Sequence, residues 1–178
     1  MHSALTADYE DTFFPLDAQV LAANSADFET RIQRCNDNAL AMATLLSGHP
    51  SVAKVYYPNM VSSAPLYEKC RRKTKSSSSM TDGITGGYSF LLSILFHHPP
   101  SAVAFYDALD VCKGPSIGTN FTLAVPYSQL AHFREQDWAE ECGVKRWIVR
   151  ISAGLEEETE VVGRVRQALE LVEDEENR

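Results

Sequence analysis

The sequence lacks the patterns that would assign it to several specialised classes of protein. Its 178 residues contain no apolar run of about 18 residues and no charged leader followed by an apolar stretch. They also contain no G-x-G-x-x-G pattern, no P-loop spacing and no internal repeat. A membrane span, a secretory signal and the common nucleotide-binding motifs are therefore not predicted.

Cysteine is scarce, and its spacing matches neither a disulfide framework nor a zinc site. The four cysteines are far apart and form no C-x-x-C pair: Cys35, Cys70, Cys112 and Cys142. This spacing is typical of free thiols in a reducing compartment. His97 and His98 are adjacent, so on a strand they would point to opposite faces, which argues against a shared metal ion. We expect a cytoplasmic protein without a metal site.

An excess of positive charge is also missing. The sequence has 24 acidic and 16 basic residues, for a formal net charge of -8. General nucleic-acid binding is therefore not expected. The acidic excess lies largely between Glu156 and Glu176, where it would form the solvated face of a helix. A basic run within residues 69–75 leads into a serine-rich stretch that is interpreted as a loop, although it could contact an acidic partner or mark a kinase site.

The sequence does contain enough apolar side chains for one core. Hydrophobic residues make up 44% of the chain and charged residues 22%, which at this length predicts a single compact domain. A helical stripe lies between Ser25 and Gly48 and consists of Phe28, Ile32, Cys35, Ala39, Met42 and Leu46. A second stripe consists of Val162, Val165, Leu169 and Val172. These patterns predict long helices over residues 26–47 and 157–173.

Apolar or alternating runs predict four strands, at about 52–57, 87–96, 118–125 and 146–153. Shorter helices are expected after Asp17, over 101–111 and within 129–142. The elements follow the order helix, strand, strand, helix, strand, strand, helix. This order favours an α+β fold, an α/β sandwich in which helices cover one face of an open sheet with mixed or antiparallel pairing.

The most informative residue is Arg150, which lies within the last predicted strand. By alternation it shares a strand face with Ile148 and Ser152, so a permanent charge lies among small or apolar side chains. Its planar fork of donors suits a carboxylate bound by two hydrogen bonds, which the protein or a ligand could supply. The alternatives are an exposed arginine on an edge strand and a structural ion pair.

Three motifs connect the sequence to a known family. V-R-I-S-A-G-L-E at residues 149–156 resembles the C-terminal signature of the Cys/Met-metabolism family of pyridoxal-phosphate (PLP) enzymes, the transsulfuration group. H-P-x-V followed by V-x-Y-P within residues 49–58 is similar to the start of the small domain in this family. S-I-G at residues 116–118 looks like the family's S-L-G segment. The T-N-F-T-L and A-V-P-Y that follow depart from the usual G-V-E-S-L and resemble fungal cystathionine gamma-synthase-like proteins.

The resemblance implies a fold and two site residues. Residues 25–178 would form the small C-terminal domain of a fold-type I PLP enzyme, with a mostly antiparallel sheet of about four strands and helices on one face. Residues 1–24 would be a remnant of the connection between domains. Arg150 would bind the alpha-carboxylate of the amino-acid substrate, and Ser116 would lie beside the lysine that carries PLP.

The resemblance also shows what this chain does not carry. PLP chemistry requires a Schiff-base lysine, which the family places in an S-x-T-K segment of its large domain. No such segment occurs here, and the nearest string, K-T-K-S at residues 73–76, has different surroundings. We therefore expect the large domain to be absent, no catalytic residue in this chain, and PLP to be bound mainly elsewhere. Lys75 and Lys113 are the lysines to test if PLP nevertheless attaches.

The function implied is that of cystathionine gamma-synthase, which replaces the gamma substituent of an O-acylhomoserine with cysteine in methionine biosynthesis. Cystathionine gamma- or beta-lyase and homoserine sulfhydrylase are alternatives within the family. A truncated, non-catalytic product that acts as an interaction domain is an alternative from another class, as is a generic α+β binding domain. The resemblance also implies a homotetrameric parent enzyme with amino-acid substrates, and neither a nucleic acid nor a membrane as partner.

Overall fold

The computed structural model describes residues 6, 9–10, 12–71 and 86–177. These residues form a five-stranded sheet with the order β1-β2-β5-β4-β3. The strands are β1 (Val52–Tyr56), β2 (Leu91–Phe96), β3 (Cys112–Lys113), β4 (Leu123–Pro126) and β5 (Val149–Ser152). All neighbouring strands pair antiparallel except β3 and β4, which are parallel. The predicted α+β class with a mostly antiparallel sheet is confirmed.

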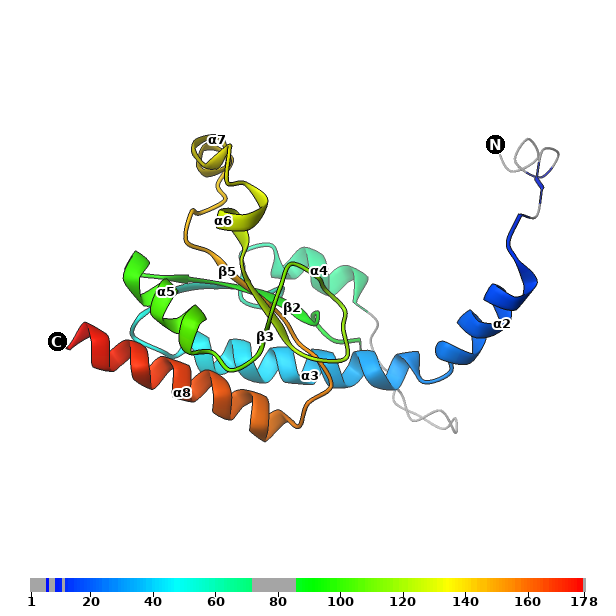
Figure 1. The fold of residues 1–178 in the computed structure, drawn as a ribbon, viewed down its shortest axis with the longest axis horizontal. Helices are drawn as coiled ribbons and strands as arrows, with labels where there is room; N and C mark the ends of the chain where they lie inside the picture. The colour runs from blue at the N-terminus through cyan, green and yellow to red at the C-terminus, as the bar shows by residue number, and fades with distance from the viewer. Residues whose placement is uncertain (1–5, 7–8, 11, 72–85, 178) are drawn as a thin grey trace.

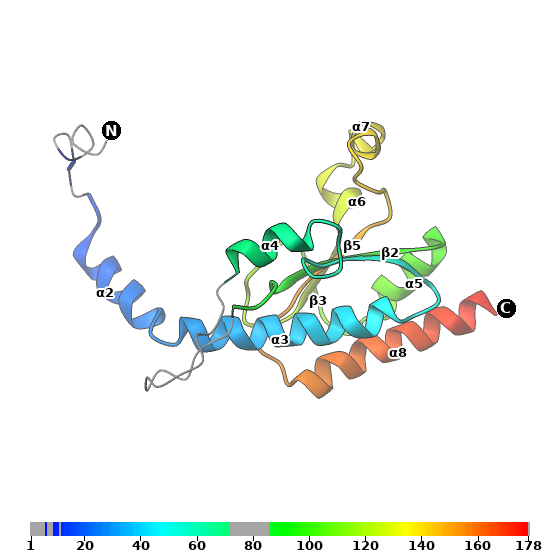
Figure 2. The same ribbon diagram turned by 180° about the vertical axis from the view of Figure 1, so that it is seen from behind.

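Seven described helices accompany the sheet. They are α2 (Pro15–Asn24), α3 (Phe28–Ser47), α4 (Ala64–Cys70), α5 (Pro99–Ala108), α6 (Tyr127–Ala131), α7 (Gln136–Glu141) and α8 (Glu158–Glu176). The two longest, α3 and α8, run side by side along one face of the sheet (Figures 1 and 2), and α5 packs against α8. The α6–α7 segment projects from the opposite side of the molecule in Figure 1.

The core lies between the sheet and these three helices. Alternate residues of the two central strands β2 and β5 are fully or almost fully buried, namely Leu92, Ile94, Val149 and Ile151. The helices bury matching stripes, with Met42 and Leu46 on α3 and Val165 and Leu169 on α8. Burial of one such side chain contributes about 1.5–3 kcal/mol. The period-two and helical patterns therefore converge on one core, as the sequence predicts.

Both long helices form close to their predicted ranges. Helix α3 ends at Ser47, where Gly48 closes the last turn by donating its amide to the carbonyl oxygen of Leu45. Helix α8 begins one residue later than predicted and continues to Glu176. The last turn extends beyond the predicted end at 173, and there Glu176 accepts hydrogen bonds from Ser51 and Ser101.

Three strands begin later than predicted, and one short strand was missed. Strand β5 spans Val149–Ser152 rather than 146–153. Strand β2 begins at Leu91 rather than 87, because Gly87 lies against the side chain of Asn36 and Ser89 has a positive φ of 142°. Strand β4 begins at Leu123, since the preceding residues form a loop held by side chains. Strand β3 spans two residues, too few to show a period, so the sheet has five strands rather than about four.

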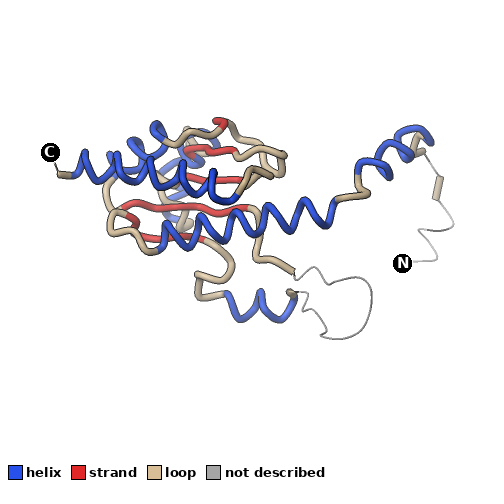
Figure 3. The backbone as a smooth tube through the Cα atoms, turned by 90° about the horizontal axis from the view of Figure 1, so that it is seen from below, coloured by secondary structure: helices blue, strands red, loops and turns tan. Residues whose placement is uncertain are grey.

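Helix α2 lies apart from the rest of the fold. Figure 3 shows it beyond the end of α3, away from the strands and the other described helices. It buries no residue, and its apolar side chains Leu16, Val20 and Leu21 are each more than half exposed. Among the described residues, no helix is both long and apolar enough to cross a membrane.

Candidate functional site

The predicted site residue Arg150 lies on the sheet face that points away from α3 and α8. Strand register places it between Ser93 of β2 and Val125 of β4, and Ser93 in turn pairs with Tyr56 of β1. Strand β5 is the central strand of the sheet, so an arginine on an exposed edge strand is excluded. The guanidinium therefore projects from the middle of the sheet.

Two contacts hold the Arg150 guanidinium. Its Nη2 donates a hydrogen bond to the carbonyl oxygen of Pro115 at 2.5 Å. Its central carbon lies 4.8 Å from the centre of the Tyr127 ring. Within the described ranges, no carboxylate lies within ion-pair distance of Arg150, and neither Nε nor Nη1 has a hydrogen-bond partner. The structural ion-pair alternative is thus not observed, and donors remain for a ligand.

The loop that carries Ser116 is attached to β5 on both sides of that serine. Arg150 binds the carbonyl oxygen of Pro115, and the Ser152 hydroxyl accepts a hydrogen bond of 3.1 Å from the amide of Gly118. Ser152 is only 2% exposed, and Gly118 has a φ of 73°, which favours glycine. Ser116 itself is exposed. The structure thus brings the two predicted site residues together, while their roles stay predictions.

The end of the V-R-I-S-A-G-L-E motif forms a hydrogen-bonded turn that supports β5. The Thr122 hydroxyl accepts from the Gly154 amide at 3.0 Å and donates to the Glu156 carboxylate at 2.8 Å. The amide of Thr122 donates to the same carboxylate at 2.6 Å. From α3, the Asn38 amide donates to the carbonyl oxygens of Gly154 and Glu156. This support joins segments far apart in the sequence, so sequence reasoning missed Thr122 and Asn38.

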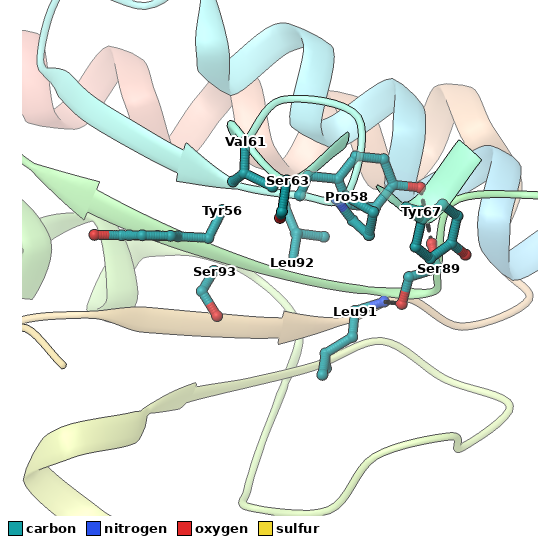
Figure 4. A pocket seen from close by; sticks show the side chains of 10 residues that line it. Tyr56, Pro58, Val61, Ser63, Tyr67, Ser89, Leu91, Leu92 and Ser93 are labelled. Atoms are coloured by element: carbon teal, nitrogen blue, oxygen red, sulfur yellow. Dashed lines mark hydrogen bonds between the residues drawn. The ribbon is translucent and has the colours of Figure 1, made fainter. Parts of the chain in front are cut away.

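A hollow of about 420 Å³ lies at the β1–β2 side of the sheet, and Figure 4 shows the side chains that line it. Serine and tyrosine hydroxyls line it together with apolar groups, and no charged side chain does; the hydroxyl residues are Tyr56, Tyr57, Ser63, Tyr67, Ser89 and Ser93. Ser93 connects the two features, because it lines the hollow and is also the strand partner of Arg150. No sequence pattern marks this hollow, since its lining comes from β1, β2, α4 and the loops that join them.

The lysine nearest to Ser116 in the sequence is already engaged. Lys113 Nζ donates to the carbonyl oxygens of Leu109, at 2.7 Å, and Tyr106, and thereby satisfies the C-terminal end of α5. Burial lowers the pKa of the Lys113 ammonium. Lys113 is therefore not placed to carry an aldehyde cofactor, and Lys75 lies outside the described residues.

Comparison with known proteins identifies the family. The family model described as Cys/Met metabolism PLP-dependent enzyme matches residues 8–170, which is most of the chain. The chain belongs to this family. PLP is accordingly the family's cofactor, and the resemblance expected from the three sequence motifs is confirmed. The residues of the described chain show no group of three or more His, Cys, Asp or Glu that could hold a metal ion.

Named members of the family include fungal relatives. The chain is 51% identical over 173 residues to a cystathionine gamma-synthase-like protein of Aspergillus thermomutatus and 41% identical over 174 residues to a cystathionine gamma-synthase of Neurospora crassa. These alignments cover 97% and 98% of this chain but only 29% and 26% of the relatives. The chain therefore corresponds to less than a third of either protein.

A solved structure shows the same fold. The cystathionine gamma synthase of Xanthomonas oryzae, solved in complex with cystathionine, aligns with a TM-score of 0.69 at 22% identity. The alignment covers 83% of this chain and 36% of the bacterial chain. This similarity agrees with the expected fold, that of the small domain of a fold-type I PLP enzyme.

Proposed function

We propose that this chain is the substrate-binding C-terminal domain of a PLP-dependent transsulfuration enzyme, with gamma-replacement on an O-acylhomoserine by cysteine as the reaction. The similarity to fungal cystathionine gamma-synthases supports the reaction class. In this proposal residues 25–178 are the small domain, residues 1–24 belong to the connection between domains, and the Schiff-base lysine lies in a large domain outside this sequence.

The observation that carries the proposal is the guanidinium of Arg150 on the central strand, which has no carboxylate partner among the described residues. Among the described residues it retains free donors at Nε and Nη1, while Pro115 and Tyr127 restrict its position. The parallel donor pairs of a guanidinium are Nε with Nη2 and Nη1 with Nη2, so the second N–H of Nη2 together with Nε or Nη1 can bind a carboxylate through two hydrogen bonds. PLP, when bound in the complete enzyme, supplies an electron sink for chemistry at the amino acid's alpha carbon.

In this arrangement Arg150 binds and orients the substrate. A carboxylate held at two points has one orientation, so the alpha carbon is presented to the reacting centre in one geometry. The loop around Ser116 adjoins the carboxylate position, because Pro115 contacts Arg150 directly. Ser116 would border the same substrate from the loop side.

The test uses a chimera in which residues 25–178 replace the matching segment of the Neurospora crassa enzyme. Arg150→Ala and Arg150→Lys are expected to lower kcat/KM for the amino-acid substrate about 30-fold to 1000-fold, because one charge-assisted contact worth roughly 2–4 kcal/mol is lost. Lysine keeps the charge but loses the paired donors. PLP absorbance and the thermal midpoint are expected to stay near those of the unsubstituted chimera.

Arg146→Lys is the matched control, since Arg146 binds Asp137 and Glu140 on an exposed surface. It is expected to leave kcat/KM unchanged. An unaltered kcat/KM in Arg150→Ala would assign Arg150 a structural role and contradict the proposal.

The compartment and the assembly are also part of the proposal. All four cysteines are free thiols, which supports a reducing compartment such as the cytoplasm. The homotetramer implied by the family resemblance can be measured on the chimera by light scattering.

A further inference from the structure

The aromatic ring that contacts the Arg150 guanidinium belongs to Tyr127. Tyr127 is the first residue of α6 and follows directly on β4, so it is part of the fold's backbone framework rather than a free loop. Its ring centre lies 4.8 Å from the guanidinium carbon of Arg150. At this distance the negative ring face attracts the cation and the planar group can lie flat against the ring.

Tyr127 is itself held in place. Its amide donates to the carbonyl oxygen of Ile148 at 3.0 Å, which ties the start of α6 to the residue before β5. The ring meets His132 edge to face, with 5.5 Å between ring centres, and His132 Nδ1 lies 2.8 Å from the Glu135 carboxylate. These contacts restrict both the backbone and the ring, so the ring can act as a fixed platform.

The contacts of Arg150 restrain its guanidinium on one side and leave several N–H donors without a partner. Pro115 accepts one hydrogen bond from Nη2 and the Tyr127 ring covers one face, whereas Nε, Nη1 and the second N–H of Nη2 have no partner among the described residues. A long arginine side chain without such restraint would sample many rotamers, and only some would present the free donors to a ligand. Affinity falls in proportion to the fraction of the protein in the competent conformation.

We infer that Tyr127 is a positioning residue, whose ring face holds the Arg150 guanidinium in the orientation that binds the substrate carboxylate. This inference rests on the proposed function of Arg150. It adds that Tyr127 determines the orientation in which the substrate carboxylate binds. No hydrogen bond from the Tyr127 hydroxyl is found among the described residues. The ring, and not the hydroxyl, is therefore the functional part.

The experiment uses nuclear magnetic resonance on the 178-residue chain, with L-cystathionine as the carboxylate probe. In the unsubstituted chain, the side-chain protons of Arg150 are expected to resonate upfield of arginines that lie over no ring, as those of Arg71 over Tyr88 also should. Tyr127→Phe is expected to keep this upfield shift and the Kd for the probe. Tyr127→Leu is expected to lose the shift and to raise the Kd about threefold to thirtyfold.

Tyr106→Leu is the matched control, because Tyr106 lies on α5, does not line the hollow and has its own cation, Lys113, at 4.2 Å from its ring centre. It is expected to leave the Arg150 signals and the Kd unchanged. Equal Kd values in Tyr127→Leu and the unsubstituted chain would overturn the inference while leaving the proposed function intact.

The roles of Arg150 and Tyr127 fail in distinguishable ways. If the unsubstituted chain binds no probe, the proposed function of Arg150 is contradicted. The chemical shift of Arg150 then tests by itself whether Tyr127 holds the guanidinium. A normal, unshifted Arg150 signal in the unsubstituted chain overturns the positioning role regardless of binding. This measurement needs no variant, so it remains decisive even if Tyr127→Leu fails to fold.

Discussion

At the scale of single residues, the site depends on one close backbone approach at Gly154. A β-carbon at this position would lie 2.4 Å from the carbonyl carbon of Phe121. Only glycine permits the Gly154 amide to reach the Thr122 hydroxyl while the two backbones are this close. The contact keeps the loop before β4 against the end of β5, next to Ser152 and Arg150.

Gly154→Ala is expected to lower the free energy of unfolding by about 1–3 kcal/mol, because the added methyl group forces two backbone segments apart. Urea denaturation followed by circular dichroism measures this change. Gly163→Ala in α8 is the matched control, since a β-carbon there meets nothing within 4 Å. It is expected to stabilise the helix by about 0.5–1 kcal/mol. If both variants were equally stable, the close approach at Gly154 would not contribute to the free energy of unfolding.

At the scale of elements, the strands are connected by buried polar contacts as well as by the sheet ladder. Tyr57, directly after β1, is 1% exposed, and its hydroxyl donates to the carbonyl oxygen of Ser89 at 2.8 Å. Burial raises the pKa of the Tyr57 hydroxyl well above its ordinary value, so it remains a donor across the physiological range. This bond fixes the entry to β2, where Ser89 has an unfavourable positive φ.

Tyr57→Phe is expected to destabilise the fold by about 1–3 kcal/mol, because the carbonyl group of Ser89 loses a buried donor. Differential scanning calorimetry would show this as a lower Tm. The neighbouring Tyr56→Phe removes a hydroxyl that has no hydrogen-bond partner among the described residues, and its effect is expected to stay within about 0.5 kcal/mol. A Tm for Tyr57→Phe equal to that of Tyr56→Phe would show that water replaces the lost donor.

The end of α8 is connected to the rest of the fold by a titratable group. Hydrogen bonds from Ser101 and Ser51 to Glu176 hold the pKa of its carboxyl group below the ordinary value, and the nearby His98 and His49 act in the same direction. A lowered pKa in the folded state means that the ionised form stabilises folding. This contribution is present above the ordinary pKa of about 4.5 and disappears as pH falls through the folded-state pKa.

Glu176→Gln is therefore expected to be less stable than the unsubstituted chain at pH 7 and equally stable near pH 3. The difference at pH 7 is expected to be about 0.2–1 kcal/mol, since the carboxylate is largely exposed and screened by water. Urea denaturation at both pH values measures it. Glu175→Gln serves as control because its side chain forms no hydrogen bond or ion pair with another described residue. A difference for Glu176→Gln that persists at pH 3 would contradict the linkage.

At the scale of the whole molecule, the described fold has a complete core and a partial site. The core is closed by α3, α5 and α8, whereas the opposite sheet face presents Arg150 and the adjacent hollow, and α2 extends outward with exposed apolar side chains. The proposed function requires this distribution, because a second domain would have to complete the site on the open sheet face.

The isolated chain is expected to bind no stoichiometric PLP and to show no internal-aldimine absorption, because the ammonium of Lys113 is held by the carbonyl groups of α5. Reduction with borohydride in the presence of PLP, followed by mass spectrometry, tests this. Chemically acetylated chain serves as the blank for non-specific labelling. Stoichiometric attachment at one lysine, Lys75 or Lys113, would contradict the prediction.

The sequence alone determined the elements whose pattern is local and repeated. The stripe from Phe28 to Leu46 specifies α3, because helical spacing places these residues on one face. The alternation around Arg150 specifies a strand residue, and the adjoining motif letters identified the family. These features depend on neighbours in the chain, so they can be read without knowing the fold.

Only the tertiary structure decided which groups meet. Two contacts join residues that are distant in sequence: Arg150 with Tyr127, and Thr122 with Glu156. The late start of β2 at Leu91 likewise depends on distant residues. The energies of these contacts depend on how strands and loops pack together. The local spacing of residues along the chain does not reveal this packing. The A-V-P-Y departure marked the position of Tyr127, but its meaning follows from β4 lying beside β5, because that pairing brings the ring to the guanidinium.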